Sequence, residues 1–140
     1  MELLRTIKKA RWNLSVEITS DDTKILNLLP DPIGNLNTIE SRLSVWDIGI
    51  DRGRLGQIIK SLAKRGDKFQ NIAYAIFSSA LLEKHHISMK KTLSSEHKKI
   101  SNYHYDIEIP TSKNLLELTK SIILNAELDR MYSKEIENLP

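Results

Sequence analysis

The sequence predicts a mixed fold of the α/β or α+β class, with a small sheet built on one βαβ unit. Three observations predict it. An apolar run of mixed alternation over residues 43–50 indicates a strand. Apolar residues recur at helical spacing over residues 54–65, and residues 71–77 are apolar at nearly every position, as in a strand buried on both faces. Strand, helix and strand in this order favour parallel pairing with a right-handed crossover.

The first forty residues give a mixed pattern. Apolar residues at helical spacing over residues 2–10 predict a short helix or an extended segment, and the alternation over residues 13–18 predicts a strand. One or two helical turns are expected over residues 20–29. Pro30 and Pro32 would end them, because each proline disfavours the helical conformation of its predecessor.

Three glycines, Gly49, Gly53 and Gly56, separate the predicted strand from the predicted helix. Their spacing is not G-x-G-x-x-G, and the turn lacks the Gly-Lys-Ser/Thr end of a phosphate-binding loop. Asp51 is expected to cap the helix, where its carboxylate would occupy the amides that a phosphate needs. The turn is therefore predicted to be a strand-to-helix connection, with Gly66 ending the helix.

The second half of the chain continues the mixed pattern. A short helix is expected over residues 78–86, followed by a long exposed loop or frayed edge strand over residues 87–101. Clean alternation over residues 102–109 predicts an edge strand or a strand with one face buried. From residue 112 onward, apolar positions at helical spacing predict one long or broken amphipathic C-terminal helix.

The composition favours one ordinary globular domain spanning residues 1–140. The absence of cysteine excludes disulfides, thiolate metal sites and a cysteine nucleophile. Neither a bilayer-spanning apolar run nor a signal peptide is recognisable, so the expected location is the cytoplasm, without membrane association. A net charge of +3 permits a nucleic-acid partner without requiring one.

Evidence for catalysis is sparse. His104 and Asp106 lie two residues apart on the predicted strand 102–109, so they would share a face, and a carboxylate can orient an imidazole. They are the weak candidates for acid–base chemistry, but one such pair is an incomplete catalytic set. The histidine spacing fits no metal site, and no cofactor is predicted.

Two groups of basic residues suggest anion binding. Lysine supplies phosphate attraction without base-specific geometry. The candidates in the N-terminal group are Arg5, Lys8, Lys9 and Arg11. The candidates in the lysine-rich loop are Lys84, Lys90, Lys91, Lys98 and Lys99.

The leading hypothesis is a small non-catalytic protein that binds a partner protein or a second copy of itself. An accessory subunit, an antitoxin or immunity-type inhibitor, and a regulator all fit this description. Its support is the C-terminal apolar stripe, which exceeds what a small sheet can cover. The predicted interface residues are Met131, Tyr132, Ile136 and Leu139. The alternative is a nucleic-acid-binding protein that uses the lysine-rich loop, and a metal-independent nuclease is less favoured.

Overall fold

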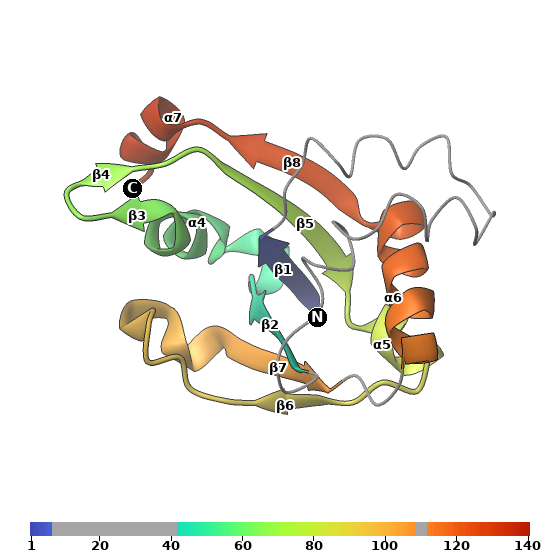
Figure 1. Cartoon of the computed structure of the whole chain (residues 1–140). Coiled ribbons are helices and arrows are strands. Elements are labelled where there is room, and N and C mark those ends of the chain that lie inside the picture. The colour runs from blue at the N-terminus through green and yellow to red at the C-terminus, as the bar shows by residue number, and fades with distance from the viewer. Residues whose placement is uncertain (7–41, 109–111) are drawn as a thin grey trace.

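The structure is a computed structural model, and it describes residues 1–6, 42–108 and 112–140. These residues form a mixed α/β fold, which confirms the predicted class (Figure 1). The strands of the main sheet are β1 (Glu2–Thr6), β2 (Arg42–Asp47), β5 (Ile72–Ser78), β6 (Met89–Lys91), β7 (His104–Glu108) and β8 (Glu127–Met131). They form a six-stranded sheet in the order β6-β7-β2-β1-β5-β8, and every neighbouring pair is antiparallel.

Helices and one small hairpin complete the described part of the chain. The helices are η2 (Ile50–Arg52), α4 (Leu55–Ala63), α5 (Ala80–Lys84), η3 (Lys98–Tyr103), α6 (Ser112–Asn125) and α7 (Ser133–Glu137). A separate two-stranded hairpin consists of β3 (Lys64–Arg65) and β4 (Lys68–Phe69). In the described ranges, every helix falls short of the length and apolarity that a bilayer crossing needs.

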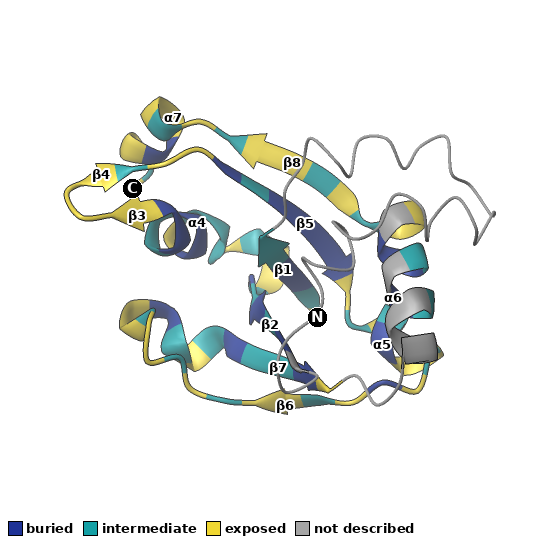
Figure 2. Ribbon diagram, viewed as in Figure 1, coloured by how far each residue is buried: buried dark blue, intermediate teal, exposed yellow. Residues whose placement is uncertain are grey.

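Two apolar clusters fill the space between the sheet and its helices. On one face of the sheet, the side chains pack with residues of α5 and α6: Leu3, Leu43, Val45, Ala75, Phe77, Leu82, Ile87, Ile107, Leu118 and Ile122. On the other face they pack with α4, η3 and α7: Leu4, Trp46, Ile48, Ile58, Ile59, Leu62, Ala63, Ile72, Tyr74, Ile76, Ile100 and Ile136. Figure 2 shows burial concentrated on the central strands, whereas the edge strands are mostly exposed or half-buried.

Strand β1 lies near the centre of the sheet, although a helix or extended segment was predicted for this region. Leu3 packs into the first apolar cluster and Leu4 into the second, and neither side chain is exposed. Consecutive residues of a strand point to opposite faces, so two adjacent leucines can each fill a core. A strand buried on both faces therefore lacks the alternation that would identify it.

The predicted unit of two strands and a helix is present, but its strands do not pair. β2 and β5 each pair antiparallel with β1, so they run in the same direction with β1 between them. The expected direct parallel pairing is therefore wrong. The helix between them, α4, begins and ends within two residues of its predicted bounds.

Strand β7 confirms the predicted strand at 102–109 but not its position at the edge. It pairs with β2 on one side and with β6 on the other, so β6 is the edge strand. β6 lies within the segment 87–101, which was expected to be a loop or a frayed edge strand. Lysines at an exposed edge disfavour further strand pairing, and Lys90 and Lys91 supply them here.

The C-terminal region is not one amphipathic helix. After α6 the chain forms strand β8, which pairs along five residues of β5, and then the short helix α7. Without β8, the edge of the long buried strand β5 would leave its backbone groups unpaired, and such groups are costly to leave unsatisfied. Tertiary pairing has therefore overridden the helical spacing of residues 127–131.

The glycine turn is a strand-to-helix connection, as predicted, but its details differ. The Gly49 amide donates to Asp47 Oδ1 over 2.9 Å, and Asp47 also pairs with Arg54 over 3.3 Å. The N-cap of α4 is Arg54 and makes no side-chain capping bond, so the capping role predicted for Asp51 is wrong. Gly66, with φ 62°, lies in the turn between β3 and β4 instead of ending the helix.

Arg52 holds the beginnings of β1 and β8 together. Its guanidinium donates to the carboxylates of Glu2 and Glu127. The hydrogen bond from Arg52 lowers the pKa of Glu127, and the bond to Glu127 raises the pKa of Arg52. Because Arg52 and Glu127 are both about one-third exposed or more, solvent screening limits the contribution of the pair.

Replacing Arg52 by Gln is expected to lower the free energy of unfolding by at most about 1 kcal/mol at neutral pH. The folded-state pKa of Glu127 lies below its unfolded value, so the contribution is fully present above the unfolded pKa. It is lost as the pH falls through the folded pKa. Urea unfolding of wild type and Arg52→Gln between neutral and acidic pH measures this, and a difference that grows on acidification would contradict it.

Candidate functional site

A cavity of about 420 Å³ lies between α4, the β3–β4 hairpin and the start of η3. We call it the basic cleft. Its lining residues are Gln57, Lys60, Ser61, Lys64, Phe69, Ser95, Glu96, His97, Lys98, Lys99 and Pro140. Four of them are lysines: Lys60 of α4, Lys64 of β3, and Lys98 and Lys99 of η3, which is far from the other two elements in the sequence.

One wall of the basic cleft is the polar side of α4. The opposite side of this helix is anchored in the core by Ile58, Ile59, Leu62 and Ala63. Lys60 is held in place, because its Nζ donates to the Leu139 carbonyl over 2.9 Å and lies 5.8 Å from the Phe69 ring centroid. Lys64 follows the last residue of α4 and is exposed.

The other wall is the start of η3 with the loop before it. Ile100 is fully buried and anchors this short helix, while Lys98 and Lys99 are exposed. A side chain of the loop braces it, since Ser94 Oγ accepts a hydrogen bond from the His97 amide over 3.1 Å. Both lysines are therefore carried on an anchored segment.

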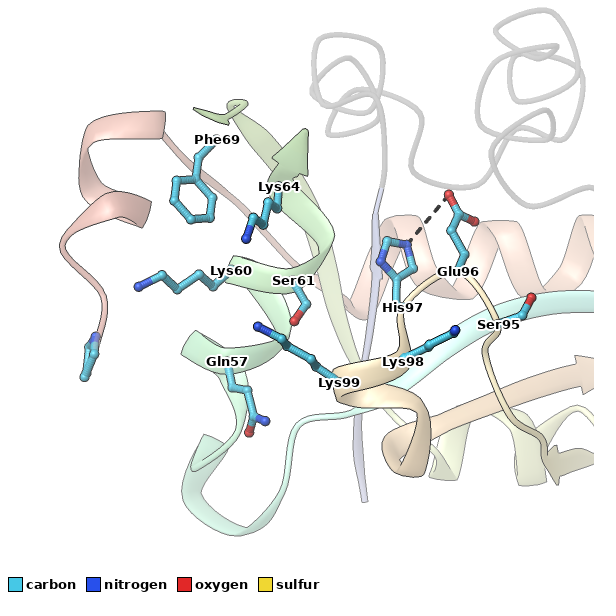
Figure 3. A pocket seen from close by; sticks show the side chains of 11 residues that line it. Gln57, Lys60, Ser61, Lys64, Phe69, Ser95, Glu96, His97, Lys98 and Lys99 are labelled. Carbon is cyan, nitrogen blue, oxygen red and sulfur yellow. Dashed lines mark ion pairs between the residues drawn. The ribbon is translucent and has the colours of Figure 1, made fainter. Parts of the chain in front are cut away.

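Figure 3 shows how the charged side chains are directed. Lys99 extends from η3 toward Ser61 of α4, Lys64 points toward Lys60, and Lys98 points to the other side, toward Ser95. Among the described lining residues, Glu96 is the one with an acidic side chain. Four lysines and one acidic side chain give the lining an excess of positive side-chain charge, which favours binding of an anion.

A second cavity, of about 360 Å³, adjoins the first, and Glu96 and His97 line both. We call it the polar cavity. Its other lining residues are Arg5, Thr6, Ser44, Trp46, Leu62, Ala63, Arg65, Gln70, Asn71, Ile72, Ala73, Ser94 and His104. Hydroxyl, amide, imidazole and guanidinium groups make up most of this lining, so the polar cavity can hydrogen-bond a polar ligand.

Trp46 is the largest side chain at the polar cavity and is 5% exposed. Its ring meets His97 and His104 edge-on, at centroid distances of 6.0 and 5.2 Å. The indole Nε1 is buried and has no hydrogen-bond partner within the described residues. Ring packing therefore positions Trp46, and Trp46 in turn positions both imidazoles.

Two arginines lie at the polar cavity. Burial lowers the pKa of Arg5 to about 10, and its Nη1 donates to the Ser44 carbonyl over 3.0 Å. Arg65 is exposed, and its Nη1 donates to the carbonyls of Leu62 and Lys64 over 3.2 and 3.0 Å. The Arg5 side chain therefore remains protonated at neutral pH, and the Arg65 guanidinium is a second cationic group in the lining of the polar cavity.

The predicted pair His104 and Asp106 does share a face of β7, with His104 Nε2 lying 3.8 Å from Asp106 Oδ1. His104 Nδ1 lies 2.8 Å from Thr92 Oγ1, and Thr92 and Ser44 both hydrogen-bond the Asp106 carboxylate. These bonds link β2, β7 and the residue after β6. The network gives His104 Nδ1 and the Asp106 carboxylate partners on neighbouring strands, which is a structural role, and acid–base chemistry by this pair stays a prediction.

The predicted basic residues are not brought together. Lys98 and Lys99 line the basic cleft, and Arg5 lines the polar cavity. Lys84 lies at the end of α5, and Lys90 and Lys91 lie on the edge strand β6. Lys8, Lys9 and Arg11 lie outside the described residues.

Lys60 and Lys64 were not among the anion-binding residues predicted from the sequence. The signal was present, because they are four residues apart on the polar side of the predicted helix 54–65. Nothing in the sequence indicated that Lys98 and Lys99 line the same cavity as Lys60 and Lys64, since that depends on how η3 packs against α4.

The predicted interface residues of the C-terminal stripe are mostly used within the chain. Ile136 is fully buried, and Met131 and Leu139 pack against the second apolar cluster. Tyr132 is 49% exposed. The stripe therefore completes the core on the α4 face instead of leaving an apolar surface for a partner. Protein binding through another surface stays a prediction.

Within the described ranges, no three histidine, aspartate or glutamate side chains converge as a metal site would require. Comparison with models of protein families, with curated proteins and with solved structures gives no match.

Proposed function

We propose that the protein binds single-stranded nucleic acid, with the phosphate backbone in the basic cleft. The observation that carries the proposal is that four lysines, from α4, β3 and η3, line one cavity whose described lining includes a single acidic side chain. Lysine contacts phosphates as a point charge and carries no sequence information. The proposed site keeps Lys98 and Lys99 of the lysine-rich loop and combines them with Lys60 and Lys64, whereas Lys84, Lys90 and Lys91 lie outside it.

A single strand fits this site better than a duplex. The cationic groups surround a concavity, whereas reading a duplex groove requires an element that protrudes into it. Phe69 is half-buried and lines the basic cleft beside Lys60. Aromatic side chains within a positively charged groove are typical of proteins that bind single strands, because bases stack on them.

The test is fluorescence anisotropy with labelled oligonucleotides of about 12 nucleotides, single-stranded and double-stranded, over a range of salt concentrations. Single strands are expected to bind more tightly than duplexes. The logarithm of the binding constant should fall with the logarithm of salt with a slope of about −2 to −3, since each of the three or four lysine contacts contributes about −0.7.

Polyglutamate of similar length serves as the competing anion. If it displaced the oligonucleotide as effectively as unlabelled oligonucleotide does, the cleft would instead favour an acidic protein. Absence of oligonucleotide binding at about 50 mM salt would overturn the proposal, because electrostatic contacts are strong at that concentration.

A further inference from the structure

The polar cavity continues the basic cleft but has different chemistry. The two share Glu96 and His97, so a ligand bound in one can extend into the other. The basic cleft offers ammonium groups, whereas the polar cavity offers several hydrogen-bonding groups around an aromatic residue, Trp46. Its volume of about 360 Å³ falls in the range of small-molecule sites. A base attached to a backbone in the basic cleft could therefore enter it.

The presence of an acidic residue, Glu96, in the lining of the basic cleft is not explained by phosphate binding. Its side chain is 82% exposed, and its carboxylate approaches His97 Nε2 no closer than 4.0 Å (Figure 3). A carboxylate at this position repels phosphates, yet it lies at the junction of the two cavities. Its oxygens are free of close hydrogen bonds to other described residues, so they can accept bonds from a ligand.

The geometry of a carboxylate restricts the kinds of ligand that Glu96 can bind. Its two oxygens lie side by side and accept two parallel N–H donors, as they do from arginine. Among the common bases, guanine presents two adjacent donors on its pairing edge, N1–H and the N2 amino group. Uracil and thymine present one donor there, and adenine and cytosine present one amino group beside an acceptor.

We propose that the polar cavity receives one unstacked guanine base of the bound strand, with Glu96 accepting hydrogen bonds from its N1–H and N2–H groups. This inference rests on the proposed function, because the phosphates on either side of the base are held by the basic cleft. Unstacked bases of single strands are commonly read on this edge. Glu96 therefore supplies base selectivity, whereas the lysines supply sequence-independent affinity.

The test compares three DNA oligonucleotides of about 12 nucleotides: all thymidine, thymidine with one central guanosine, and thymidine with one central inosine. The guanosine strand is expected to bind about tenfold more tightly than the all-thymidine strand, as for a bidentate base contact. Inosine lacks the N2 amino group and should fall between them. In the Trp12→Phe variant, where Trp46 is the sole tryptophan, the guanosine strand should quench its emission more than the thymidine strand does.

Glu96→Gln should remove the guanosine preference and leave the affinity for the all-thymidine strand unchanged or slightly higher. Glu83→Gln is the matched control, since Glu83 is an exposed carboxylate on α5 and should keep the preference. Equal binding of the three strands to wild type, or a preference that survives in Glu96→Gln, would overturn this inference alone. Failure of all three strands to bind would overturn the proposed function as well.

Discussion

Reversing the charge of Lys64 and Lys99 together is expected to weaken binding of single-stranded oligonucleotides by about 30-fold to 1000-fold. Each exposed lysine contributes up to about 1 kcal/mol of attraction, and glutamate replaces it by repulsion of similar size. Both side chains line the basic cleft. Anisotropy titrations of Lys64→Glu/Lys99→Glu against wild type measure the loss. In Lys64→Ala/Lys99→Ala the salt slope should fall in magnitude by about 1 to 2.

The matched control is Lys84→Glu/Lys91→Glu. It makes the same change in net charge, but both lysines lie on elements that do not line the basic cleft. The cleft account predicts a loss of less than about threefold, from the general charge of the protein alone. An equal loss in the two double variants would show that binding follows overall charge. A larger loss in the control would favour the lysine-rich loop that the sequence indicated.

Ile136→Ala is expected to lower the free energy of unfolding by about 2–5 kcal/mol, because it leaves a cavity where a fully buried side chain packed. Ile136 is the buried residue of α7, which packs against α4. The loss is a large share of the stability of a typical domain. Urea unfolding followed by circular dichroism measures it.

Tyr132→Ala is the control for this substitution. Tyr132 is half-exposed and contacts Arg130, so its removal should cost less than about 1 kcal/mol. If Ile136→Ala cost no more than Tyr132→Ala, α7 would not be packed as the structure has it. The predicted partner interface at the C-terminal stripe would then regain its support.

How far the fold could be predicted depended on how each strand is buried. Residues 71–77 were identified because an uninterrupted apolar run is characteristic of a doubly buried strand. Strand β1 has the same burial but offers only Leu3 and Leu4 as its apolar pair, and the nearby residues 7–10 extended a helical pattern. Two apolar residues are too few to distinguish the helical periodicity of 3.6 residues from the strand periodicity of two.

Two other errors have one cause, which is pairing between segments far apart in the sequence. The alternation over residues 102–109 predicts a strand but does not indicate which strands pair with it. The edge of β7 that was expected to be free is paired with β6. Residues 127–131 keep a helical spacing of apolar side chains, yet β5 offers them an unpaired edge, and the hydrogen bonds gained decide the outcome. Local periodicity carries no information about such long-range partners.

The sequence indicated which kinds of side chain form the candidate site, but it did not indicate that they lie together. The sequence indicated Lys98 and Lys99 as anion-binding residues and placed Lys60 and Lys64 on the polar side of a helix. That these four line one cavity depends on the packing of η3 against α4. Conversely, His104 and Asp106 share a face as predicted, but Thr92 engages both, and Thr92 carries no sequence signal for that role.

The most direct test of the basic cleft is to map where a single strand binds. Amide chemical shifts of isotopically labelled protein would be followed as an unlabelled oligonucleotide of about 12 nucleotides is added. We expect the largest changes in residues 57–64 and 95–99, which contribute to the two walls of the cleft. Changes confined to residues 84–91 or to the C-terminal segment 127–137, with the cleft residues unaffected, would contradict it.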